Sequence, residues 1–105
     1  IRDRYMASGY KILWTQNAIL ELEGIIAYLE EHWTERELKN FSRELDHVME
    51  LISKNPELFQ ASSAKKDVRR AVIGRYTNLY YRMGSNTVEI LSLFSNRQNP
   101  SKLKL

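Results

Sequence analysis

The hydrophobic residues of this 105-residue chain change from helical to alternating spacing near residue 67. From Ala18 to Ile52, apolar side chains recur every three or four residues, which is the period of an amphipathic helix. After residue 67 they alternate along the chain, as in a half-buried strand. A chain that places its helices first and most of its strands last is expected to adopt the α+β class, with the helices packed on one face of a mainly antiparallel sheet.

A first helix of about 16 residues is expected from Ala18 onwards. Thr15 or Asn17 can cap its N-terminus with a side-chain oxygen, and the helix should end at residues 32–33. Its apolar stripe consists of Ala18, Leu22, Ile25, Ile26, Leu29 and Trp33.

A second helix should follow at once. Thr34 and Glu37 have the spacing of a capping box, in which the threonine hydroxyl accepts from the glutamate amide. Asn55 and Pro56 should end this helix, because asparagine tolerates a left-handed cap and proline cannot continue the hydrogen-bond ladder. With almost no linker between them, the two helices should form an antiparallel hairpin. The second stripe is Leu38, Phe41, Leu45, Val48, Met49 and Ile52.

Four segments have strand character. Residues 10–14 (YKILW) are rich in aromatic and branched side chains. The other three are joined by short segments with hairpin-turn composition, and they span residues 68–73, 77–83 and 87–94. The expected fold is an N-terminal strand, a helical hairpin and a three-stranded antiparallel meander, in a single domain over residues 10–105. Residues 1–9 are polar and aperiodic, and they are expected to be disordered or foreign to the native protein.

Alternation along the middle strand of the meander predicts two unlike sheet faces. The expected inner face, packed on the helices, carries Thr77, Leu79, Tyr81 and Met83. The other face, expected to be polar and partly open, carries Asn78, Tyr80 and Arg82.

Charge is unevenly distributed along the chain. Residues 1–55 hold 7 Lys+Arg and 10 Asp+Glu, whereas residues 56–105 hold 9 and 3. A basic half on a small domain suggests an acidic partner, either nucleic acid or an acidic protein segment. A solvated surface on which the charges happen to cluster is an equally good explanation of the charge alone.

Several classes of function are excluded by composition. The chain has no cysteine, which rules out disulfides and thiolate sites and favours a reducing compartment. No residues have the spacing of metal ligands, and no glycine-rich phosphate loop occurs, so neither a metal nor an organic cofactor is expected. No apolar run approaches the roughly 20 residues that cross a bilayer, so we expect a cytoplasmic protein without a membrane partner.

The expected open face and its surroundings are rich in arginine and tyrosine. Guanidinium groups bind phosphates and tyrosine rings stack on unpaired bases, so this composition suits RNA. The alternative is that both residue types simply occupy a half-exposed sheet. The residues in question are Arg69 or Arg70, Arg75, Tyr80, Arg82, Arg97 and Gln98.

We assign no catalytic role to the histidines or to the carboxylates of the first predicted helix. His32 and His47 lie on the predicted helices, away from the basic face. Glu21, Glu23, Glu30 and Glu31 are expected on the solvent side of the first helix.

The sheet half of the chain contains four short motifs in a fixed order: VRRAVIGRY at 68–76, LYYR at 79–82, VEIL at 88–91 and NRQNP at 96–100. With these motifs the chain resembles the RelE/ParE toxins of type II toxin–antitoxin systems. The resemblance extends from residue 10 to about residue 103 and includes the opening strand, Thr15 and Ala18 at the start of the first helix, and the Asn55-Pro56 pair. Each motif is weak alone, but their order and spacing together are fairly specific for the superfamily.

This resemblance implies one of two growth-inhibiting activities. RelE-like members cut messenger RNA on the ribosome without a metal, and ParE-like members poison DNA gyrase. Both are held inactive by a cognate antitoxin protein, so the implied partners are an antitoxin and either the ribosome with its message or gyrase. The long helical hairpin and the 68–76 motif look more ParE-like. The assembly is left open between a homodimer and a heterotetramer with the antitoxin.

If the chain cuts RNA, the chemistry of cleavage and the positions of the basic residues suggest Arg75 and Arg97 as phosphate contacts, Arg82 as an orienting group, and Lys65 or Lys66 as a proton-transfer group. Arg69, Arg70, Tyr80 and Gln98 are the expected nucleic-acid or target contacts. The sequence departs from the RelE-like pattern in having no tyrosine after Gln98, where some members carry a catalytic one. Two alternatives are a non-toxic relative that only binds antitoxin or regulates its own operon, and an unrelated RNA-binding module.

Overall fold

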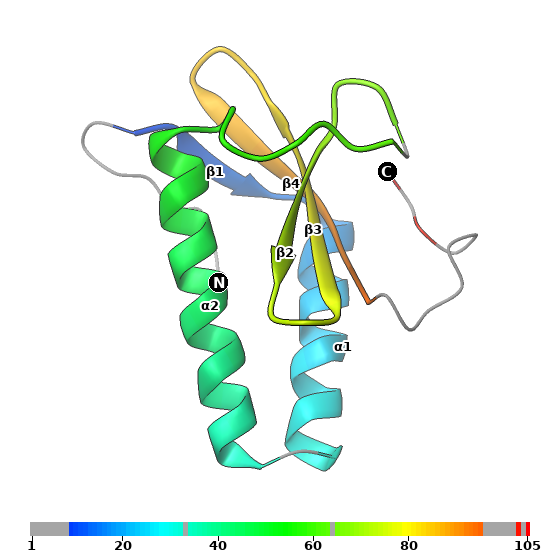
Figure 1. Ribbon diagram of the computed structural model, residues 1–105. Helices are drawn as coiled ribbons and strands as arrows, with labels where there is room; N and C mark the ends of the chain where they lie inside the picture. The colour runs from blue at the N-terminus through cyan, green and yellow to red at the C-terminus, as the bar shows by residue number, and fades with distance from the viewer. Residues whose placement is uncertain (1–8, 33, 64, 96–102, 104) are drawn as a thin grey trace.

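The structure, a computed structural model, describes residues 9–32, 34–63, 65–95, 103 and 105. In chain order it contains β1 (Lys11–Trp14), α1 (Gln16–His32), α2 (Glu35–Lys54), β2 (Arg69–Ile73), β3 (Thr77–Met83) and β4 (Thr87–Ser95), as Figure 1 shows. The α+β class, the helical hairpin and the element boundaries agree closely with the prediction. The expectation for residues 1–8 and the stripe position Trp33 lie outside the described residues.

The four strands form one sheet in the order β1-β4-β3-β2. The meander of β2, β3 and β4 is antiparallel, as predicted. β1 lies beside β4 and runs parallel to it, with Lys11 opposite Thr87 and Trp14 opposite Ile90. Parallel strands need a long connection, and here the helical hairpin and the other two strands supply it. The sheet is therefore mixed rather than antiparallel throughout.

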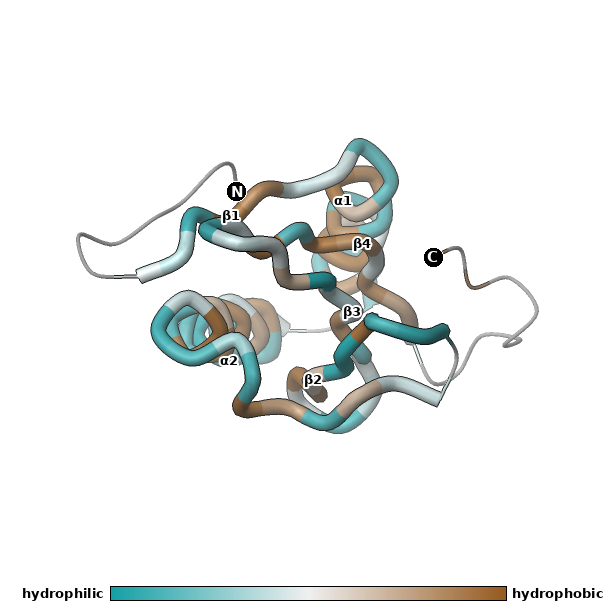
Figure 2. Tube along the Cα trace, turned by 90° about the horizontal axis from the view of Figure 1, so that it is seen from above, coloured by the Kyte–Doolittle hydropathy of each residue, from teal (hydrophilic) through white to brown (hydrophobic). Residues whose placement is uncertain are grey.

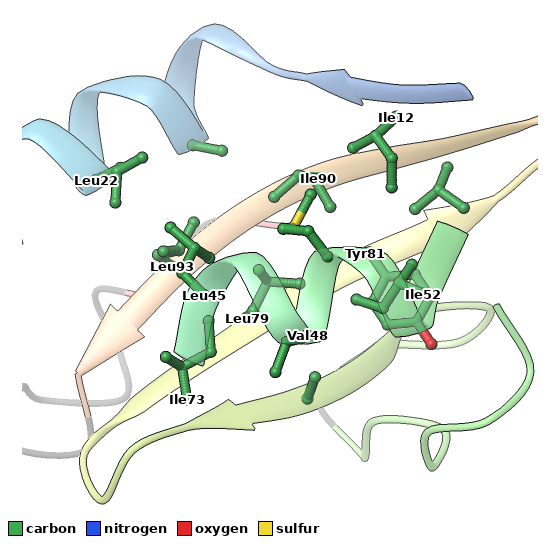
Figure 3. Packing of buried hydrophobic residues seen from close by; sticks show 14 residues of the cluster. Ile12, Leu22, Leu45, Val48, Ile52, Ile73, Leu79, Tyr81, Ile90 and Leu93 are labelled. Atoms are coloured by element: carbon green, nitrogen blue, oxygen red, sulfur yellow. The ribbon is translucent and has the colours of Figure 1, made fainter. Parts of the chain in front are cut away.

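Both helices contribute to one hydrophobic core against the sheet. Figure 3 shows Leu45, Val48 and Ile52 of α2 facing the strands and Leu22 of α1 packing from the side. Seen from above in Figure 2, α1 lies along β4, while α2 lies over the part of the sheet that includes β2. The inner face of β3 is buried in this core as predicted, with Thr77 at 8% exposure and Leu79 and Tyr81 at 0%. The apolar faces of the helices and of the sheet therefore pack against each other and form one core.

Polar side chains at the start of α1 replace a strand along part of β4. Because β1 pairs with β4 only as far as Ile90, the edge of β4 beyond that residue faces α1. Asn17 Nδ2 donates to the Leu91 carbonyl at 3.0 Å, and Glu21 Oε1 accepts from the Leu93 amide at 3.2 Å and from the Ser92 hydroxyl at 2.6 Å. The prediction that Glu21 lies on the solvent side was wrong, since its carboxylate satisfies the backbone of a sheet edge.

The second face of the sheet is covered where it was expected to be open. Asn78 and Tyr80 are 5% and 6% exposed. A bulge between Tyr80 and Tyr81 shifts the register against β4. Tyr80 packs in a small second core that also holds Val68, Leu91, Phe94, Leu103 and Leu105. The prediction failed because the alternation of β3 alone could not show that apolar residues from β4 and from the end of the chain gather on this face.

Caps define both ends of α2. The Thr34 hydroxyl accepts from the Glu37 amide at 3.3 Å, as predicted. Asn55 follows the last helical residue at the expected place, but its φ of −148° is not left-handed. The predicted left-handed cap was therefore wrong. The Asn55 amide still bonds to the Leu51 carbonyl, and the chain turns at the residues that follow.

We expect Thr34→Ala to lower the free energy of unfolding by about 1 kcal/mol, because the N-cap acceptor is lost. Thr34→Ser keeps a hydroxyl and should stay within about 0.5 kcal/mol of the wild type. Urea unfolding followed by circular dichroism measures both. Equal stability of the two variants would contradict a capping role.

Candidate functional site

The predicted basic residues lie at two opposite ends of the sheet. Arg75 is exposed in the turn of residues 74–76 that joins β2 to β3. Lys65 and Lys66 are exposed in the loop before β2, and Arg82 lies near the far end of β3. Thr77, next to the turn, and Arg82 are separated by roughly 17 Å along the strand at about 3.4 Å per residue. The described members of the predicted catalytic set therefore do not converge on one point.

Arg69 and Arg70 point to opposite faces of the sheet. Arg69 lies on the inner side, where its Nη1 donates to the Phe59 carbonyl at 2.7 Å. Arg70 is exposed, and its backbone amide bonds to the Gln60 carbonyl at 3.0 Å. Of the two, Arg70 is the one placed to meet a partner, whereas Arg69 holds the loop after α2 against the sheet.

The remaining predicted contacts are partly engaged within the chain. Arg82 Nη1 lies 3.5 Å from Glu89 Oε1 across the β3–β4 pair. Lys65 Nζ donates to the Leu105 carbonyl at 3.0 Å. The ring of Tyr80 is buried in the second core and is not placed to stack on a base. Arg97 and Gln98 lie outside the described residues.

A groove of about 900 Å³ opens between the two helices and the end of the sheet that carries Arg75. Its floor is apolar and its rim carries carboxylates, one arginine and two tyrosines. Tyr28 and Tyr76 on this rim are 45% and 43% exposed. The floor and rim include Ile25, Leu29, Phe41, Ile73 and Leu93 together with Glu21, Glu37, Glu44 and Arg75.

A carboxylate of α2 bonds to the 74–76 turn. Glu44 Oε2 accepts from the Gly74 amide at 2.6 Å. Gly74 has φ of 63°, a left-handed conformation that glycine adopts without strain. This contact fixes the turn that presents Arg75 and Tyr76 at one end of the groove.

Neither Glu44 nor the groove was anticipated from the sequence. A signal for both structural carboxylates was present, however. Glu44 lies three residues after Phe41 and four before Val48, and Glu21 lies three after Ala18 and four before Ile25. A charged side chain at helical spacing beside an apolar stripe lies near the elements that pack on that stripe, so it can reach a hydrogen-bond donor there.

The histidines and acidic residues form no further site in the described part of the chain. His32 is exposed at the end of α1 and stacks on Tyr28 with ring centroids 4.3 Å apart. His47 is exposed on α2. Among the described residues, no three His, Cys, Asp or Glu side chains gather as metal ligands would, and neither α1 nor α2 is long and apolar enough to span a membrane.

Comparison with known proteins found a matching family and a similarly folded chain. The sequence profile described as the ParE toxin of the type II toxin–antitoxin system parDE matches residues 12–100. A solved structure titled as the chromosomal ParDE TA system from P. aeruginosa contains a similarly folded chain, with a TM-score of 0.66 and 14% identity over 80% of this chain and 92% of that chain. No curated protein sequence matches this one significantly.

Proposed function

The chain belongs to the ParE toxin family of type II toxin–antitoxin systems, and from this premise we propose that it arrests growth by inhibiting DNA gyrase rather than by cutting messenger RNA. The observation that carries the choice of target is the separation of the predicted catalytic cations. RNA cleavage needs a base, an acid and a phosphate-stabilising cation within hydrogen-bond reach of one phosphate. Arg75 lies at the opposite end of the sheet from Lys65, Lys66 and Arg82, so these residues suit binding rather than catalysis.

The 74–76 turn is the proposed contact with the target. It projects from the sheet beside the groove and carries Arg75 and Tyr76, both exposed. Arginine and tyrosine are the residue types that most often dominate protein interfaces, because each combines a large contact area with hydrogen bonding. An exposed pair on a short, anchored turn is a suitable surface for binding another protein.

The groove is the proposed seat of a cognate antitoxin. Its apolar floor offers the hydrophobic area that a stable complex buries, and its rim includes Arg75 and Tyr76. An antitoxin segment in the groove would cover the turn and exclude the target. Neutralisation then follows from simple competition for the same residues.

Two reactions on the purified chain test the proposed target. With gyrase, ATP and relaxed plasmid, the protein should block supercoiling and leave linear DNA after detergent and protease treatment. In a reconstituted translation reaction on a defined message, primer extension should reveal no cuts that depend on ribosomes. Codon-positioned cuts together with unaffected gyrase would reject the proposal in favour of a ribosome-dependent nuclease.

A charge reversal tests the proposed contact. We expect Arg75→Glu to raise the concentration needed for half-inhibition at least about tenfold, which corresponds to about 1.4 kcal/mol of lost binding energy. Arg36→Glu, an exposed position on α2, makes the same charge change and should remain close to wild type. If both variants weaken inhibition equally, only net charge matters and the turn is not the contact.

A further inference from the structure

We propose that Glu44 is a positioning residue that holds the 74–76 turn in the geometry required for target binding. The inference rests on the proposed function, because it assigns Glu44 a role through Arg75. Glu44 comes from α2 and Gly74 from the β2–β3 connection, and the contact between them spans 30 residues of sequence. It joins the turn to the helical hairpin.

The geometry of the contact is that of a strong hydrogen bond. The acceptor is a carboxylate oxygen 2.6 Å from the amide nitrogen, and charge-assisted hydrogen bonds of this length are stronger than neutral ones. Ile73 and Thr77 are the last paired residues on the two sides of the turn, so residues 74–76 lie beyond the ladder. The bond at Gly74 restricts the conformation of the turn where the ladder does not.

Glu44 can be changed with little effect on the core. Its side chain is exposed, and the core residues of α2 lie on either side of it. A substitution should loosen the turn while the rest of the fold stays intact. Rigid presentation of Arg75 and Tyr76 lowers the conformational entropy that is lost when a target binds, so a loosened turn should bind more weakly without losing any contact residue.

A set of four variants tests this role in a growth assay with matched expression, where the readout is the inducer level that halves growth. Glu44→Ala should require about tenfold more toxin, the order expected for a hydrogen bond to a charged group. Glu44→Gln keeps an amide oxygen as acceptor and should stay within about threefold. Glu35→Ala removes an exposed carboxylate from the same helix, where Lys39 is its ion-pair partner, and should behave as wild type.

The fourth variant combines Glu44→Ala with Arg75→Ala. If Glu44 acts through the turn, the loss in the double variant should be smaller than the product of the two single losses, because coupled residues are not additive. Hydrogen exchange supplies a structural readout: the Gly74 amide should exchange at least about tenfold faster in Glu44→Ala, while core amides of β3 keep their protection.

The outcomes separate this inference from the proposed function. Wild-type potency of Glu44→Ala, or losses that multiply in the double variant, would overturn the positioning role. A wild-type protein that arrests growth without inhibiting gyrase would remove the proposed target, yet the same variants would still decide the role of Glu44. A wild-type protein that does not arrest growth would overturn both.

Discussion

Glu21→Ala should lower the free energy of unfolding by about 2–3 kcal/mol, one of the two largest effects expected in this protein. The carboxylate accepts from the Leu93 amide and the Ser92 hydroxyl, and these two residues are 1% and 0% exposed. Removing the acceptor leaves two buried donors without their partner, and each such loss costs about 1–3 kcal/mol. Glu21 also lines the groove, so water can reach these donors once the carboxylate is removed. We therefore place the expected loss near the lower end of the combined range.

Two further substitutions on α1 make the measurement specific. Glu23→Ala removes an equal charge from an exposed position of the same helix, and it should change stability by no more than about 0.5 kcal/mol. Glu21→Gln keeps an acceptor oxygen without the charge and should fall between the two. Urea unfolding monitored by circular dichroism gives all three values. A Glu21→Ala variant as stable as Glu23→Ala would mean that the edge of β4 does not depend on this side chain.

The fold was largely predictable because its elements are specified locally. The two helices, the Thr34 cap and the strand segments β2 to β4 each depend on near neighbours in sequence, and each appears in the structure close to the expected residues. The parallel pairing of β1 with β4 could not be predicted in this way, because it depends on residues far apart in the sequence. A strand carries the same period whichever neighbour it has, so residues 11–14 alone could not reveal a partner more than 70 residues away.

The candidate site was less predictable because it depends on which distant groups meet. Arg75 was singled out, and the structure places it on an exposed turn. Arg69 and Tyr80 were singled out for the same residue chemistry, yet one bonds to a loop carbonyl and the other lies in a second core. Glu21 and Glu44 were dismissed or overlooked because a glutamate on a helix is usually solvated. Only the tertiary structure shows the backbone amides of Leu93 and Gly74 that give them a role.

Tyr81 is a buried tyrosine that ties the sheet to the end of α2. Its side chain lies in the main core at 0% exposure, and its hydroxyl donates to the Pro56 carbonyl at 2.5 Å. Burial raises the pKa of Tyr81 to about 12, although the nearby Arg69 guanidinium acts in the opposite direction. The folded protein therefore holds the phenolic proton more tightly than the unfolded chain, in which a tyrosine ionises near pH 10.

This difference predicts a loss of stability at alkaline pH. The stabilisation from the protonated hydroxyl is fully present below about pH 10 and is lost as the pH rises through about 12. A difference of about two pKa units corresponds to at most about 3 kcal/mol. Tyr81→Phe loses the bond to Pro56 and should be about 1 kcal/mol less stable than wild type at pH 8, but it has no proton to lose at this position.

Urea unfolding of wild type and Tyr81→Phe at several values between pH 8 and pH 12 tests the prediction. All other ionisable groups are common to both proteins, so the difference between their free energies of unfolding isolates Tyr81. That difference should favour wild type at pH 8, shrink above pH 10 and reverse before pH 12, because the unfolded wild-type chain is stabilised by ionisation of Tyr81 while the folded protein still holds the phenolic proton. Parallel curves over the whole range would mean that the Tyr81 hydroxyl ionises as readily in the folded protein as in the unfolded chain.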